Sequence, residues 1–84
     1  MRSESEELDE LHRFMGDRVR EARRHKRLSQ QELATKAGIH RSYLIKIEQG
    51  LGNPSGDVIW LLARGCEVEV AYFFPPLPGD TQPG

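Results

Sequence analysis

The chain has 84 residues, of which 37% are hydrophobic, so it has room for one small domain with a modest core. No apolar run reaches the roughly 18 residues that would indicate a membrane span. The acidic first residues lack a signal-peptide core, and a single cysteine, Cys66, cannot form an internal disulfide. We therefore expect a cytoplasmic protein with no second domain for ligand binding or self-cleavage.

The formal net charge of −1 hides an uneven distribution along the chain. Residues 1–11 carry one base and five acids (−4), residues 12–50 carry ten bases and four acids (+6), and residues 51–84 carry one base and four acids (−3). Attraction to phosphate groups depends on such a local patch rather than on the whole-chain charge. The middle of the chain is therefore suited to a nucleic-acid partner.

The first part of the chain predicts an arm followed by a helix. Residues 1–7 read as a solvated acidic N-terminal arm. A first helix is expected from Leu8 to about Lys26, because apolar residues recur there every three or four positions, at Leu8, Leu11, Met15, Val19 and Ala22. Its other faces carry more positive charge than solubility requires.

Residues 28–50 predict two short helices separated by a glycine turn. Ser29 and Glu32 form an S-x-x-E capping box, which predicts a helix over residues 30–37 that Gly38 ends. In the next helix, over residues 41–49, Leu44 and Ile47 share one face. Two helices joined this way are typical of a unit whose second helix enters a major groove of DNA.

The last third of the chain predicts one more clear helix. Residues 50–54 form a turn, and Ser55 is placed to cap a helix over residues 56–64. Residues 66–74 are ambiguous, since the alternation at 67–70 and the β-branched and aromatic content favour a strand. Residues 75–84 read as a disordered Pro/Gly tail, with a P-x-x-P ligand as the lesser alternative.

Several stretches together resemble the Cro and phage-repressor (xenobiotic-response-element) helix-turn-helix family: residues 15–19, 28–34, 47–50, 53–55 and 73–74. The resemblance implies an all-α, compact five-helix lambda-repressor-like DNA-binding domain over residues 8–74, with a short fifth helix at 70–74 instead of a strand. Residues 41–44 and 65–74 look like the controller proteins of restriction-modification systems. The sequence departs from the wider family at Glu67, where glycine is usual, and at Ile45, where a polar residue is usual.

The candidate DNA-binding residues combine chemistry with this resemblance. Arg41, at the start of the third helix, can donate two hydrogen bonds to a guanine, and Ser42 and Lys46 share its face. Gln30, at the start of the second helix, is implied by the family to clamp a backbone phosphate, where the helix N-terminus also favours an anion. The remaining candidates for backbone contacts are His40, Tyr43 and Asn53.

Two further sets of residues have structural roles. The family resemblance implies a salt bridge between Arg23 and Glu48 that fixes the angle of the third helix. The last third also has more apolar side chains than a core of about 60 residues needs, which indicates a dimer interface. This candidate interface consists of Val58, Trp60, Leu61, Val68, Val70, Tyr72 and Phe73.

We therefore expect a sequence-specific transcription regulator that binds palindromic operator DNA as a homodimer, with a controller protein as the narrower hypothesis. The alternatives are the antitoxin and autorepressor of a toxin-antitoxin operon, and a protein-interaction module that has lost DNA binding, which Ile45 favours. No enzyme, cofactor, metal or small-molecule ligand is expected, because the three histidines have no ligand spacing and no nucleophile has an adjacent base.

Overall fold

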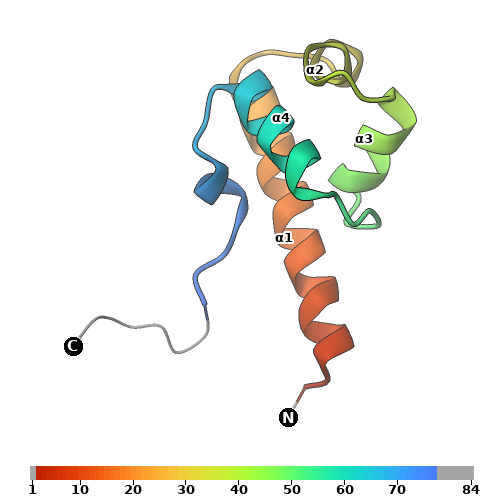
Figure 1. Ribbon diagram of the computed structural model, residues 1–84, viewed down its shortest axis with the longest axis vertical. Coiled ribbons are helices and arrows are strands. Elements are labelled where there is room, and N and C mark those ends of the chain that lie inside the picture. The colour runs from red at the N-terminus through yellow and green to blue at the C-terminus, as the bar shows by residue number, and fades with distance from the viewer. Residues whose placement is uncertain (1, 78–84) are drawn as a thin grey trace, which may run out of the picture.

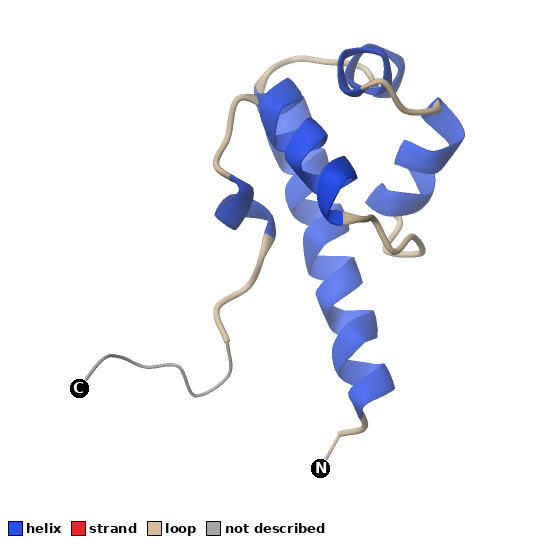
Figure 2. Ribbon diagram, in the orientation of Figure 1, coloured by secondary structure: helices blue, strands red, loops and turns tan. Residues whose placement is uncertain are grey.

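The computed structural model describes residues 2–77, which form an all-helical domain with no strand in that range. Its elements are α1 (Glu4–His25), α2 (Gln30–Ala37), α3 (Arg41–Glu48), α4 (Gly56–Cys66) and a short 3-10 helix, η1 (Val70–Phe73) (Figures 1 and 2). The all-α prediction is confirmed. Four α-helices and one 3-10 turn replace the five helices expected, and the strand alternative for residues 66–74 is wrong. The tail prediction for residues 78–84 lies outside the described residues.

Helix α1 begins earlier than the sequence analysis placed it, and the prediction of an arm is wrong for residues 4–7. The Glu6 N–H donates to Ser3 Oγ at 3.1 Å, while the Ser3 N–H donates to Glu6 Oε1 at 2.9 Å, which is a complete capping box. Acidic side chains in the first turn also suit the positive end of the helix dipole. Residues 4–7 are thus helical, although their side chains remain exposed.

Helix α1 spans the length of the molecule, with α2 near its C-terminal end and the chain's N-terminus at the opposite end (Figure 1). The core lies where the C-terminal half of α1 meets the other helices, and its fully buried side chains include Val19, Leu33, Leu44, Leu62, Cys66 and Phe73. Burial raises the pKa of the Cys66 thiol to about 11, so this cysteine is a core residue that stays protonated. No helix in the described part of the chain is long and apolar enough to cross a membrane.

Helices α1 and α3 approach each other so closely at Gly16 that no side chain fits between them. A Cβ atom at this position would lie 2.4 Å from the carbonyl oxygen of Ile47 and 2.9 Å from that of Glu48. Both neighbours are backbone atoms at the end of α3, and they cannot move without moving the helix. Gly16 costs α1 some helix propensity, and in return it sets the distance between α1 and α3.

A second backbone feature is the end of α4, where Glu67 occupies the left-handed region with φ of 59° and ψ of 45°. This conformation favours glycine, the residue usual in the family at this position. The Lys26 ammonium donates to Glu67 Oε1 at 3.0 Å and lowers the pKa of that carboxyl. The pair joins the C-terminal ends of α1 and α4 at the surface.

We predict that Gly16→Ala lowers the free energy of unfolding by about 1–3 kcal/mol, because the overpacked backbone contact outweighs alanine's better helix propensity. Gly56→Ala is the matched control, since Gly56 is also helical and a Cβ there meets nothing within 4 Å. Urea denaturation of the two variants checks both. A Gly16→Ala protein as stable as Gly56→Ala would contradict the close approach.

Candidate nucleic-acid interface

The segment from Ser29 to Glu48 forms the two predicted helices and a tight turn between them. The Glu32 N–H donates to Ser29 Oγ at 3.0 Å, and the Ser29 N–H donates to Glu32 Oε1 at 2.8 Å, so the predicted capping box starts α2. Gly38 ends α2 with φ of 72° and ψ of 30°, a left-handed cap that a residue without a Cβ adopts at no steric cost. Helix α3 then starts at Arg41 with a new direction.

The two faces of α3 divide as the helical period requires. Leu44, Ile47 and Glu48 are buried, while Arg41, Ser42 and Lys46 are exposed. His40, Ser42, Tyr43 and Lys46 together line a shallow hollow of about 180 Å³. The structure therefore brings together, on and beside the outer face of α3, five of the seven residues selected as candidate DNA contacts.

Three other positions on or near α3 bear on the choice of candidate DNA contacts. Gln49 is exposed next to the end of α3, and the sequence analysis did not select it as a candidate DNA contact. It follows Lys46 by three residues, and the helical period places the two on the same face. Asn53 is exposed in the loop between α3 and α4. Ile45 is half-buried and lies one turn after Arg41 on the same side of α3.

The predicted pair of Arg23 and Glu48 is present as a two-pronged ion pair. Arg23 Nε donates to Glu48 Oε2 at 2.7 Å and Arg23 Nη2 donates to Glu48 Oε1 at 3.0 Å. Hydrogen bonding to Glu48 raises the pKa of Arg23, against the opposing effect of burial. With exposed fractions of 9% for Arg23 and 3% for Glu48, the pair is shielded from water on both sides.

The Glu48 carboxylate also organises the polar groups around it. Gln30, expected to face a phosphate, donates from Nε2 to Glu48 Oε1 at 3.1 Å, which ties the start of α2 to the end of α3. Arg23 Nη1 donates to the Leu28 carbonyl at 3.0 Å, and Arg20 Nη2 donates to the Glu48 carbonyl. The sequence analysis gave Arg20 no role of its own, because a contact with a residue 28 positions away leaves no local pattern in the sequence.

Fewer arginines of α1 are therefore available to a nucleic acid than the sequence suggested. Arg23 and Arg20 hold Glu48, and Arg18 Nε donates to the Tyr72 carbonyl at 2.8 Å. Near the end of the helix, Arg24 and Arg27 are exposed. Part of the basic patch therefore builds the scaffold and only the remainder faces solvent.

The candidate dimer residues differ in how much surface they offer. Trp60 is 56% exposed on α4 and Val70 is 36% exposed at the start of η1, two elements that pack against each other. Four others are half-buried: Val58, Leu61, Val68 and Tyr72. Phe73 has no exposed surface because η1 turns its ring into the core, so its selection as an interface residue is wrong.

The comparison with protein families matches residues 19–73 to a helix-turn-helix family. Among curated proteins, the chain is 30% identical to an uncharacterised HTH-type transcriptional regulator of Sinorhizobium fredii, over 82% of this chain and 48% of that protein. It is 35% identical to the immunity repressor protein of Bacillus phage phi105, over 68% of this chain and 40% of that protein. The chain thus spans about half or less of the length of these curated relatives.

Solved structures give a closer match in length. The restriction-modification controller protein C.AhdI from Aeromonas hydrophila superposes with a TM-score of 0.73 and 38% identity, covering 75% of this chain and 96% of that one. The wild-type restriction-modification controller protein C.Esp1396I superposes with a TM-score of 0.69 and 27% identity, covering 75% of this chain and 83% of that one.

Fold, site and comparisons together define a helix-turn-helix module of the kind found in DNA-binding transcriptional regulators, which are not enzymes. The chain belongs to the Cro and phage-repressor type of this family.

We predict that Glu48→Ala lowers the free energy of unfolding by about 3–5 kcal/mol, because the buried Arg23 guanidinium loses its counterion. Asp17→Ala is the control, since Asp17 pairs with Arg20 at 3.1 Å but its side chain is 72% exposed, and such pairs contribute about 0–1 kcal/mol. Chemical denaturation compares the two. Equal small losses in both variants would show that the buried pair does not hold the helices together.

Proposed function

We propose that this protein is a sequence-specific transcription regulator that binds a palindromic operator as a homodimer. The observation that carries the proposal is the exposed polar face of α3, which presents Arg41, Ser42 and Lys46 while Leu44 and Ile47 anchor the opposite face. Membership of the helix-turn-helix family supports it independently.

In this proposal α3 lies in the major groove with its N-terminal residues at the base edges. Arg41 donates two hydrogen bonds to guanine O6 and N7, an arrangement worth about 1–3 kcal/mol of discrimination between bases. Ser42 and Lys46, joined by Gln49, extend the contact along the groove. The flanking groups, His40, Tyr43 and Asn53, contact the phosphate backbone and fix the register.

Gln30 has a double role in the same proposal. Its side-chain amide has two N–H donors, and one donates to Glu48 while the other stays available for a phosphate oxygen. The start of α2 adds the favourable helix dipole. Gln30 would thereby connect the phosphate contact directly to the pair that orients α3.

The dimer rests on the exposed apolar side chains of α4 and η1. Trp60 and Val70 are the most exposed of them, and half-buried Leu61 and Tyr72 lie on the same two elements. A two-fold dimer would place its two copies of α3 in successive major grooves, about 34–36 Å apart, and would therefore select a palindrome. Self-complementary apolar patches of this kind are typical of such dimers.

The narrower proposal is a controller protein of a restriction-modification system. It is supported by the 38% identity to C.AhdI, which extends over nearly all of that protein. Selection of bound sites from random DNA supplies the operator, and a two-fold consensus is the expected result.

On that selected operator, Arg41→Ala is expected to weaken binding by more than about 1 kcal/mol while affinity for random DNA changes less, because a base contact is lost. Lys46→Ala gives the comparison for a lysine on the same face. Titration of each variant with operator and random duplexes at one salt concentration measures the difference. Equal losses on both duplexes would reduce Arg41 to a phosphate contact.

For the dimer, Val70→Glu is expected to shift the protein toward monomer and to weaken binding to the palindrome far more than to an isolated half-site, because the gain from tethering two readers is lost. Leu51→Glu is the control for the oligomeric state, since Leu51 is 74% exposed but lies in the loop after α3. Sedimentation gives the oligomeric state. A Val70→Glu protein that remains dimeric with full operator affinity would place the interface elsewhere.

A further inference from the structure

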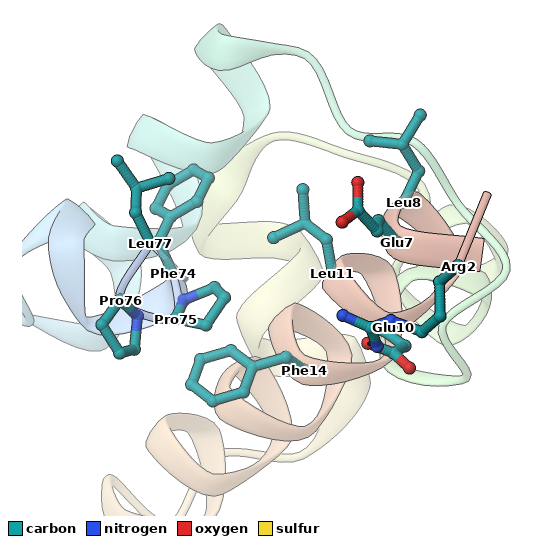
Figure 3. Close-up of a pocket in the computed structure, with 10 residues that line it drawn as sticks. All are labelled: Arg2, Glu7, Leu8, Glu10, Leu11, Phe14, Phe74, Pro75, Pro76 and Leu77. Carbon is teal, nitrogen blue, oxygen red and sulfur yellow. Dashed lines mark hydrogen bonds and ion pairs between the residues drawn. The ribbon is translucent and has the colours of Figure 1, made fainter. Parts of the chain in front are cut away.

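The N-terminal half of α1 and the segment after η1 enclose an open apolar groove of about 730 Å³ (Figure 3). Leu8, Leu11 and Phe14 form one wall, and Phe74, Pro75, Pro76 and Leu77 form the other. The groove leaves large apolar side chains in water, because Leu8 is 46%, Phe74 39% and Leu77 73% exposed. Apolar surface gathered this way in a small domain indicates a binding site.

The wall formed by the C-terminal segment is held in place beside the groove. The Arg18 guanidinium lies 3.7 Å from the centre of the Tyr72 ring and 5.6 Å from that of Phe14, and it donates to the Tyr72 carbonyl. One side chain of α1 thereby fastens the end of η1 directly before the groove. A preformed site of this kind loses little conformational entropy when it is occupied.

The charge around the groove selects the occupant. Residues 2–11 carry one base and five acids, a sum of −4, and Glu7 and Glu10 lie on the rim itself. Arg2, the one base, already pairs with Glu10. A second copy would bring another −4 against this rim at a cost in repulsion, whereas a basic segment would gain from it.

We propose that this groove docks a basic amphipathic helix of a partner protein. Leu8, Leu11 and Phe14 follow each other at intervals of three residues over about 9 Å of helix, which matches about two turns of a bound helix with apolar anchors at i, i+3 or i+4, and i+7. Lysine or arginine side chains flanking those anchors would meet Glu7 and Glu10. The site lies toward the N-terminal end of α1, whereas α2 lies near its other end (Figure 1). It does not depend on DNA binding.

The test uses the full chain without DNA and two probes of about 14 residues, helical peptides with leucine at i, i+3, i+4 and i+7 and with either lysine or glutamate at the other positions. Fluorescence anisotropy is expected to show the leucine-lysine peptide binding wild type at least about ten-fold more tightly than the leucine-glutamate peptide. The charge-reversed variant Glu7→Lys/Glu10→Lys is expected to invert that preference. Both changes are at exposed positions of α1, and circular dichroism checks that its helix persists.

A second pair of variants separates the groove from general charge attraction. Leu8→Ser/Leu77→Ser is expected to weaken the leucine-lysine peptide at least about five-fold, while Leu51→Ser, which removes an equally exposed leucine elsewhere, leaves it unchanged. The proposal is overturned if the charge reversal or the groove variant leaves peptide affinity as in wild type. It is equally overturned if Leu8→Ser/Leu77→Ser converts a dimer to a monomer in sedimentation, because the occupant would then be a second copy.

Discussion

The buried carboxylate of Glu48 is the constraint on which the arrangement of the helices depends. A carboxylate with 3% of its residue surface exposed is tolerated only when it is paired and hydrogen-bonded. Glu48 satisfies that requirement with Arg23 from α1 and Gln30 from α2, while the residue itself ends α3. One ion therefore joins three helices and leaves α3 a single well-defined orientation.

The same corner of the molecule shows that this junction is built by backbone as well as by charge. Gly16 lets the last carbonyls of α3 come against α1, and Arg20 donates to the Glu48 carbonyl there. The C-terminal end of α3 is held by contacts with both α1 and α2. The exposed polar residues at its start and on its outer face therefore do not need to contribute to the stability of the fold. Contacts elsewhere in the fold position α3, so the side chains proposed to contact bases can vary with the DNA sequence that is recognised.

Much of the fold was predictable because its signals are local. The capping box at Ser29, the glycine turn at Gly38 and the helical spacing of Leu44 and Ile47 each act within a few residues. The capping box of Ser3 and Glu6 is an equally local signal. The sequence analysis did not identify it, because it interpreted the acidic residues 1–7 as a solvated arm. A short helix near the end of the domain, found as the 3-10 helix Val70–Phe73, was expected only from the family resemblance, since propensity alone favoured a strand and the packing of Phe73 into the core decided the outcome.

Most of the long-range contacts of the candidate site could not be predicted from the sequence. Arg18 and Arg20 look identical to other arginines of α1, and only the fold assigns one to Tyr72 and the other to Glu48. Phe73 and Val70 are neighbours of similar character, and the direction of a single 3-10 turn buries one and exposes the other. The groove beside Leu8 joins segments at least 60 positions apart, so no local sequence pattern predicts it.

The most direct test of the central claim is a double-mutant cycle between Glu48→Gln and Arg41→Ala, measured as affinity for the selected operator under conditions where all four proteins are folded. If Glu48 orients α3 for base contact without touching DNA, the loss caused by Arg41→Ala should shrink in the Glu48→Gln protein, with a coupling free energy of at least about 1 kcal/mol. Losses that add within about 0.3–0.5 kcal/mol would contradict the claim, because they would mean that Arg41 finds its base whether or not the buried pair holds α3.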